Sequence, residues 1–266
     1  MYLNLDRLDY ILRYVIYKGM TELEKENSLN ISIEEMTQAG LYFGHKTSRI
    51  HPKMSPYLLG SRNSIHIIDL EKTAQKIKEA LKFIQELILQ NKTLLLVGTK
   101  IQVKDLVKNI ALECGLPYVN ERWLGGTFTN FDVILKRIGQ FKDLERRKMN
   151  GELGKYTKKE IAKIETRLKD FEKNFGGVKN LQKLPDAIFV LDMRKDALAV
   201  KEAKSKKIKV IGIADTNVDP TLADYPIPAN DDAISSVKYI LEKVKEVILE
   251  AKSKIESSDE KTNQKP

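Results

Sequence analysis

The sequence predicts an α/β protein built on a doubly wound parallel sheet, with an antiparallel α-helical (coiled-coil) hairpin inserted into it. Short apolar runs alternate with helical periodicity on both sides of a long charged segment. This alternation is typical of parallel strands joined by helices. The charged segment repeats apolar residues at steps of three and four, which is the pattern of a coiled-coil seam. We therefore expect an α/β body at residues 31–128 and 179–252 and a helical hairpin at residues 129–178.

The bulk composition points to a polyanion as partner. The chain of 266 residues carries a net charge of +9, and 31% of its residues are charged. A basic balance of this size favours binding to nucleic acid, although many unrelated proteins share it. The single cysteine, Cys114, excludes an intrachain disulfide framework and a zinc site built on several cysteines.

The two ends of the chain differ in composition from the body. Residues 1–30 form an N-terminal extension that we expect to be mobile or weakly helical. Asp6, Arg7, Asp9 and Arg13 interrupt its apolar residues, so it matches neither a signal sequence nor a membrane span. Residues 253–266 are polar, and we expect a disordered tail there.

The body contains six predicted strands and four predicted helices. The run at residues 93–98 is apolar throughout, as in a parallel strand that is buried on both faces. The run at residues 225–229 contains two prolines, which suit an edge strand. The expected strands are 64–70, 93–98, 117–119, 187–192, 209–215 and 225–229, and the expected helices are 71–90, 101–114, 197–206 and 231–252.

The predicted hairpin has two amphipathic halves separated by Asn150 and Gly151. Residues 129–178 contain thirteen Lys or Arg and eight Asp or Glu, and so carry +5 of the net +9. Arg146 and Arg147 belong to the most basic run, which makes them weaker candidates for contact with phosphates. The seam residues are Phe131, Ile134, Ile138, Phe141 and Leu144 in the first half, and Ile161, Ile164, Leu168, Phe171, Phe175 and Val178 in the second.

The junction between body and hairpin lies at residues 117–131 and contains the only tryptophan. Trp123 is most simply a buried anchor, and the alternative is a ring that stacks on a base or a partner. Gly125 and Gly126 permit a sharp turn and a close backbone approach. Asn130 or Thr129 is placed to cap the helix that follows by accepting a hydrogen bond from its first amides.

A second informative segment is the acid-free stretch at residues 40–66, which Gly, Pro and Ser predict to be mostly loop. Its basic residues and interleaved aromatic residues suit contact with phosphates and some stacking. All three histidines, His45, His51 and His66, also lie here. A histidine metal site is the alternative, but the spacing matches no ligand motif, so we expect no metal. The basic residues are Lys46, Arg49, Lys53 and Arg62.

The alternative hypothesis of an enzyme depends on aspartates at the ends of predicted strands. Asp69, Asp192 and Asp215 follow three strands, and carboxylates at that edge of a sheet could hold Mg²⁺ in a phosphohydrolase or nuclease. The simpler explanation is that they cap turns and helices. Residues 97–100 follow a strand but lack the glycine spacing of both nucleotide-binding motifs.

Several long motifs resemble one family. These are FGHKTSRIHPKM at residues 43–54, RNSIHIIDLEKT at 62–73, RWLGGTFTNF at 122–131, PDAIFVLD at 185–192, and the run from IADTNVDP to IPANDDAI at 213–234. Over residues 33–252 the chain resembles the bacterial-type small-subunit ribosomal protein two family. Motifs of this length in the same order are far more specific than a single short signature. Residues 1–30 lie outside the resemblance.

The resemblance implies a Rossmann-like body with a protruding helical hairpin, no catalytic activity and no cofactor. It also implies a ribosome-bound protein, most simply in the bacterial cytoplasm, that binds small-subunit rRNA and neighbouring ribosomal proteins. In bacteria these neighbours include the multi-domain ribosomal protein one. The residues that we expect to face RNA are His45, Lys46, Arg49, Lys53, Arg62, Arg122 and Thr127, with Arg146 and Arg147 as weaker candidates.

Overall fold

A five-stranded parallel sheet forms the centre of the protein. The computed structural model describes residues 31–263, so the expected N-terminal extension lies outside them. The strand order is β5-β4-β6-β7-β8, and every neighbouring pair is parallel. The proline-containing strand β8 lies at one edge, as predicted. The strands are β4 Leu94–Val97, β5 Tyr118–Val119, β6 Ala187–Val190, β7 Lys209–Ala214 and β8 Tyr225–Pro228.

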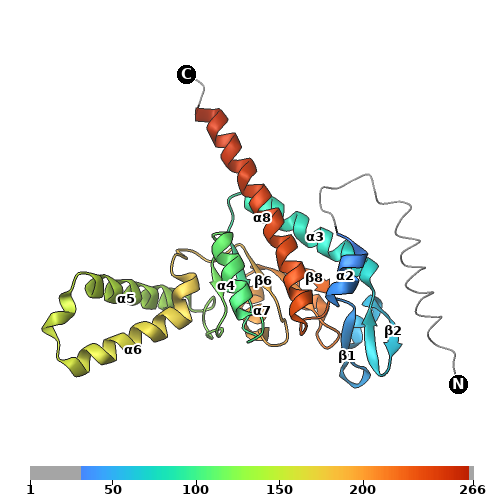
Figure 1. The fold of residues 1–266 in the computed structure, drawn as a ribbon, viewed down its shortest axis with the longest axis horizontal. Helices are drawn as coiled ribbons and strands as arrows, with labels where there is room; N and C mark the ends of the chain where they lie inside the picture. The colour runs from blue at the N-terminus through green and yellow to red at the C-terminus, as the bar shows by residue number, and fades with distance from the viewer. Residues whose placement is uncertain (1–30, 264–266) are drawn as a thin grey trace.

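Alternate residues of these strands face two separate apolar clusters. Leu94, Leu96 and Phe189 pack against helices α3, α4 and α8. Leu95 and Val97 face the opposite side, where helix α7 and the junction segment cover the sheet. Helices therefore cover both faces, and Figure 1 shows α3, α4 and α8 together on one of them. The helices are α3 Leu70–Leu89, α4 Lys104–Glu113, α7 Ala197–Ser205 and α8 Ile234–Asn263.

Residues 40–66 are not mostly loop, contrary to the sequence prediction. They contribute strands β1 Phe43–Lys46 and β2 Leu58–Arg62 to a second sheet, with β3 Ile65–Ile68 between them. Both pairings are antiparallel. The segment lacks a clear alternation of polar and apolar residues because most of β2 is exposed. Strand β3 thus belongs to this small sheet and not to the parallel sheet. Helix α2, Ile33–Ala39, precedes it.

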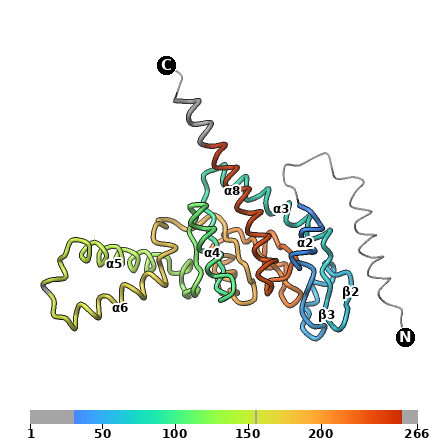
Figure 2. Tube along the Cα trace, in the orientation of Figure 1, coloured from blue at the N-terminus to red at the C-terminus, as the bar shows by residue number. Residues whose placement is uncertain are grey.

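Helices α5 Phe131–Met149 and α6 Lys158–Phe175 form a pair that projects from the body (Figures 1 and 2). Thr157 and Glu160 make a reciprocal capping box that starts α6. The buried seam residues Phe141, Phe171 and Phe175 belong to the same cluster as Leu95 of the parallel sheet. The seam is therefore continuous with the core at its base. The division into a body and a separately folding insert at residues 129–178 stays a proposal.

The last helix is longer than the sequence predicted. We expected it to end at Lys252 and a disordered tail to follow, but α8 runs to Asn263, and residues 264–266 lie outside the description. Its last part contains neither Gly nor Pro, so no residue type there stops a helix. The sequence offered no apolar period beyond Lys252, because polar helices leave little trace of that kind. Among residues 31–263, no helix combines the length and apolar character needed to cross a bilayer.

Glu202 of α7 holds the junction segment in place. Its side chain is 4% exposed, and its carboxylate accepts hydrogen bonds from the backbone amides of Gly126 at 2.7 Å and Phe128 at 2.8 Å. It also accepts from the amide of Thr129 at 3.2 Å and from Nε1 of Trp123 at 3.4 Å. One buried carboxylate thus satisfies several donors of a turn that has no strand partner.

The junction residues lie partly as the sequence predicted. Trp123 is buried and contacts Phe128 edge to face. Gly126 has φ +91°, a conformation that favours glycine. Asn130 occupies the N-cap position of α5, but its side chain makes no capping hydrogen bond. The prediction that the Asn130 side chain accepts a capping hydrogen bond is therefore wrong. Glu202 instead binds the amides that precede this helix.

We expect Glu202→Ala to lower the free energy of unfolding by about 2–4 kcal/mol, because it leaves buried amides without an acceptor. Urea denaturation followed by tryptophan fluorescence measures this locally, since Trp123 is the only tryptophan. Glu250→Ala, at an exposed glutamate of α8, is the matched control and should change stability by less than about 0.5 kcal/mol. Equal denaturation midpoints for the two variants would refute a structural role for Glu202.

Candidate nucleic-acid interface

Three basic residues gather at one end of the β1-β3-β2 sheet. Lys46 on β1 and Arg62 on β2 both pair with Ile65 of the central strand β3. Directly opposed residues point to the same face, and two strand spacings place the Cα atoms of Lys46 and Arg62 about 10 Å apart. Arg49 ends the short 3-10 turn that follows β1. We call Lys46, Arg49 and Arg62 the basic end of this sheet.

The basic end carries uncompensated positive charge. All three side chains belong to exposed residues, and within residues 31–263 none of them makes an ion pair. No acidic residue occurs between Gly40 and His66. Exposed cations without a partner keep their full field for an incoming anion.

Lys53 lies apart from the basic end and already has an anionic partner. Its Nζ is 2.7 Å from Oδ2 of Asp219 and also donates to Oγ1 of Thr221 at 3.0 Å. The hydrogen bond from Lys53 holds the pKa of Asp219 at about 2. A phosphate would have to compete with this carboxylate for Lys53, so its contribution is smaller than the sequence suggested.

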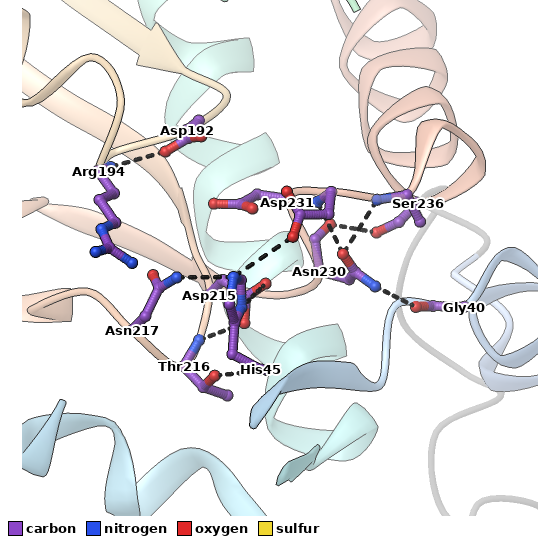
Figure 3. Close-up of polar contacts among 12 residues, drawn as sticks. Gly40, His45, Asp192, Arg194, Asp215, Thr216, Asn217, Asn230, Asp231 and Ser236 are labelled. Atoms are coloured by element: carbon purple, nitrogen blue, oxygen red, sulfur yellow. Dashed lines mark hydrogen bonds and ion pairs between the residues drawn. The ribbon is translucent and has the colours of Figure 1, made fainter. Parts of the chain in front are cut away.

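His45 points into the body, where it meets carboxylates (Figure 3). Its Nδ1 lies 3.1 Å from Asp215, and its Nε2 lies 2.9 Å from Nδ2 of Asn217 and 3.4 Å from Asp232. The hydrogen bond to Asp215 raises the pKa of His45 above its ordinary value. The ring of His45 thus joins β1 to the loops that follow β7 and β8, and its contact with RNA stays a prediction.

The crevice at the carboxyl ends of the parallel strands is occupied by Lys100. Its Nζ lies 2.8 Å from Asp192, 2.7 Å from Asp231 and 2.9 Å from Asp232. It also donates to the backbone oxygen of Asp231 at 3.0 Å. The loops after β4, β6 and β8 are thereby joined through one ammonium group. Open α/β sheets usually bind ligands at this place.

The pKa values of Lys100 and Asp231 are both raised, with opposite consequences for their charges. Burial alone would lower the pKa of Lys100, but its hydrogen bonds to Asp192 and Asp231 outweigh burial and raise the pKa. Burial, together with the negative charges of Asp192 and Asp215, raises the pKa of Asp231 to about 7. Lys100 therefore stays charged, and Asp231 takes up a proton more readily than an ordinary aspartate.

The structure does not bring the three aspartates of the enzymatic alternative together. Asp69 caps α3, accepting from the amide of Glu71 at 3.0 Å, and it follows a strand of the small sheet. Asp192 accepts from the amides of Arg194 and Lys195, as a turn-capping residue does. Nothing in this arrangement supports the hydrolase or nuclease.

One group of donors is close enough to hold a cation. Nitrogen from His45 and carboxylate oxygens from Asp215 and Asp232 lie within 4.8 Å of one another. Nε2 of His45 also lies 2.9 Å from Nδ2 of Asn217, and Oδ1 of Asp232 accepts a hydrogen bond from Lys100 at 2.9 Å. Among these donors Lys100 contacts Asp232, whereas Asp215 contacts His45.

The remaining predicted contact residues fall into two groups. Arg122 is exposed at the junction, whereas Thr127 is buried and its hydroxyl donates to the backbone oxygen of Leu124 at 2.6 Å. The Thr127 hydroxyl thus stabilises the turn, and its contact with RNA stays a prediction. Arg146 and Arg147 both contact Asp143, at 2.6 Å and 2.8 Å. Their charge is partly compensated within the hairpin.

Sequence reasoning missed Glu202 and Lys100, the two residues that organise this region. Residues 97–100 were considered only as a failed nucleotide-binding motif, and Glu202 lay in an ordinary amphipathic helix. A glutamate on the apolar side of α7 was the one available signal. At the start of α8, Oδ1 of Asn230 accepts hydrogen bonds from the amides of Asp232 and Ala233.

Comparison with protein families gives one match. The model of the family described as ribosomal protein S2 matches residues 36–251, which is most of the chain. The matched range contains both sheets, the α5–α6 pair and the Lys100 network.

We expect the free energy of unfolding to fall as pH rises from about 5 to 8. The folded state binds protons at Asp231 and His45 more tightly than the unfolded chain does, because both pKa values are raised. As the pH rises, the loss of each proton lowers the free energy of unfolding by up to about 1.4 kcal/mol per pH unit. Urea denaturation at several pH values, with EDTA present, measures the slope.

Asp231→Asn provides the control for this pH dependence. The variant cannot titrate at position 231, so its stability should vary less with pH over the same window. A wild-type stability that rises with pH, or a slope that Asp231→Asn leaves unchanged, would contradict the assignment.

Proposed function

We propose that this chain, which belongs to the ribosomal protein S2 family, binds small-subunit rRNA as a structural constituent of the small ribosomal subunit. The family is one of structural ribosomal proteins and not of enzymes. What we add is the surface that binds RNA. We assign it first to the basic end, Lys46, Arg49 and Arg62.

This assignment is supported by which basic residues already form an ion pair and which do not. Lys46, Arg49 and Arg62 are exposed and lack ion pairs among residues 31–263, whereas Lys53, Arg146 and Arg147 each contact an aspartate. A cation that is already paired gives up part of its interaction with phosphate. Unpaired cations on one sheet end keep all of it, and they fix the position of an RNA backbone without reading its sequence.

The ion pairs of Lys100 at the carboxyl ends of the parallel strands also support this proposal. Lys100 fills the place where an α/β sheet would bind a nucleotide or a metal. A ligand there would have to displace an ammonium group that contacts three carboxylates. Function is therefore carried by the outer surfaces of the fold.

Neighbouring ribosomal proteins are the second class of partner that we propose, including ribosomal protein one in bacteria. The projecting α5–α6 pair offers exposed apolar side chains for such contacts, among them Met149 at 84% exposure and Val133 at 45%. Exposed apolar residues on an extended element are typical of protein contact sites. In this proposal the protein is bound to ribosomes in the bacterial cytoplasm.

The double variant Arg49→Ala, Arg62→Ala should weaken binding to small-subunit rRNA and flatten its salt dependence. Each lost phosphate contact removes about 0.7–0.9 from the slope of log K against log salt, so the change is about one to two units. Thermal stability should hardly change, because exposed charges contribute little. Binding curves over a salt series measure the slope.

Arg146→Ala, Arg147→Ala is the matched control, since it removes the same charge from a paired site. We expect a smaller loss of affinity from it. An unchanged slope in the Arg49, Arg62 variant, or a larger loss in the hairpin variant, would move the RNA site away from the basic end.

A further inference from the structure

The end of α7 carries a dense group of lysines that the predicted site does not include. Lys201, Lys204, Lys206 and Lys207 are all exposed, and we call them the α7 lysine cluster. The only acidic residue within this stretch is Glu202, which is buried and bound to the junction amides. Lys201, Lys206 and Lys207 make no ion pair with any residue between 31 and 263. Like charges this close repel one another unless an anion joins them.

Lys207 has an unfavourable backbone conformation. Its φ is +58°, in the left-handed region. The amide of Lys207 donates to Lys204 O at 3.1 Å, and the amide of Ile208 donates to Ala203 O at 2.9 Å. These two hydrogen bonds form the Schellman motif that ends a helix, and its left-handed position is usually a glycine. A Cβ there is crowded by the backbone, and glycine avoids this crowding.

Other helices of the same protein end with residues that tolerate this conformation. The left-handed residue is Gly40 after α2, Asn91 after α3, Gly115 after α4 and Gly151 after α5. Among the described helix ends, only α7 places a long charged side chain at that position. A strained residue that persists where glycine would fit suggests that its side chain has a function.

A stabilising role in the helix alone does not account for these lysines. Positive charge in the last turn does interact favourably with the helix dipole. Lys204 already supplies such a charge, and its Nζ donates to Thr221 O at 3.0 Å. The dipole gives no reason for a lysine, rather than a glycine, at position 207.

Helix α7 contacts both the junction segment and the loop that carries Thr221. On one side Glu202 contacts the junction, where Arg122 is exposed. On the other side Lys204 and Lys53 both donate to Thr221, through Nζ in each case. The α7 lysine cluster therefore lies between the junction and Lys53.

We propose that the α7 lysine cluster binds the phosphate backbone of RNA and extends the interface beyond the basic end. The inference rests on the proposed rRNA binding and adds a second contact surface to it. Lys207 is held where its ammonium group serves an external phosphate, and Lys201 and Lys206 contact the same strand. The contacts are to phosphate, so they carry no base specificity.

The decisive variant is Lys207→Gly, because strain and binding predict opposite effects. Removing the Cβ relieves the left-handed strain, so the melting temperature should rise. Removing the ammonium group should weaken binding to small-subunit rRNA about threefold at physiological salt and lower the salt slope by about 0.7–0.9. Lys207→Arg should keep the slope, since it keeps the charge.

Asn91→Gly is the matched control, because it relieves the same motif at the end of α3 without a change of charge. It should leave rRNA binding unchanged. The variant Lys201→Gln, Lys206→Gln, Lys207→Gly should lower the slope by about two to three units. If Lys207→Gly raises the melting temperature while affinity and slope stay at the wild-type value, Lys207 only ends the helix and the inference is wrong. Failure of the proposed function itself looks different, since the wild-type chain would then not bind the rRNA.

Discussion

One ammonium group, that of Lys100, organises the protein. It lies in the crevice at the ends of the parallel strands and contacts carboxylates from the loops after β6 and β8. Through Asp232 and Asp215, the same network reaches His45 and so attaches the small antiparallel sheet to the large one. Buried charges persist only when they are paired, so these loops have to stay together. In this protein an ion-pair network that joins these loops lies where open α/β sheets usually bind ligands.

This constraint separates two classes of charged residue. Charges inside the network and the junction are engaged with partners in the chain, and of these Glu202 is buried and Lys100 is half-buried. Charges on the basic end and on the end of α7 are exposed and unpaired within residues 31–263. The first class specifies the fold, and the second is free to act on a polyanion. The chain belongs to the ribosomal protein S2 family, which is one of structural ribosomal proteins.

The sequence correctly predicted the elements that depend on a local pattern of residues. The apolar runs located all five parallel strands, and the prolines identified β8 as an edge strand. It failed where the outcome depends on contacts between distant residues. Lys100 meets Asp231 across 131 positions, and His45 meets Asn217 across 172, which no local period can reveal. Basic residues were found by composition, but composition could not tell that Lys53 is paired, that His45 faces inward or that Thr127 is buried.

The central claim is that the protein works as a bound component of the small ribosomal subunit, through charge on its surface. Sedimentation of the tagged chain through a density gradient tests this most directly. At physiological salt the account predicts that the protein migrates with small subunits and whole ribosomes, and that a high-salt wash moves it towards the top of the gradient. A chain that stays at the top of the gradient at physiological salt would contradict the account.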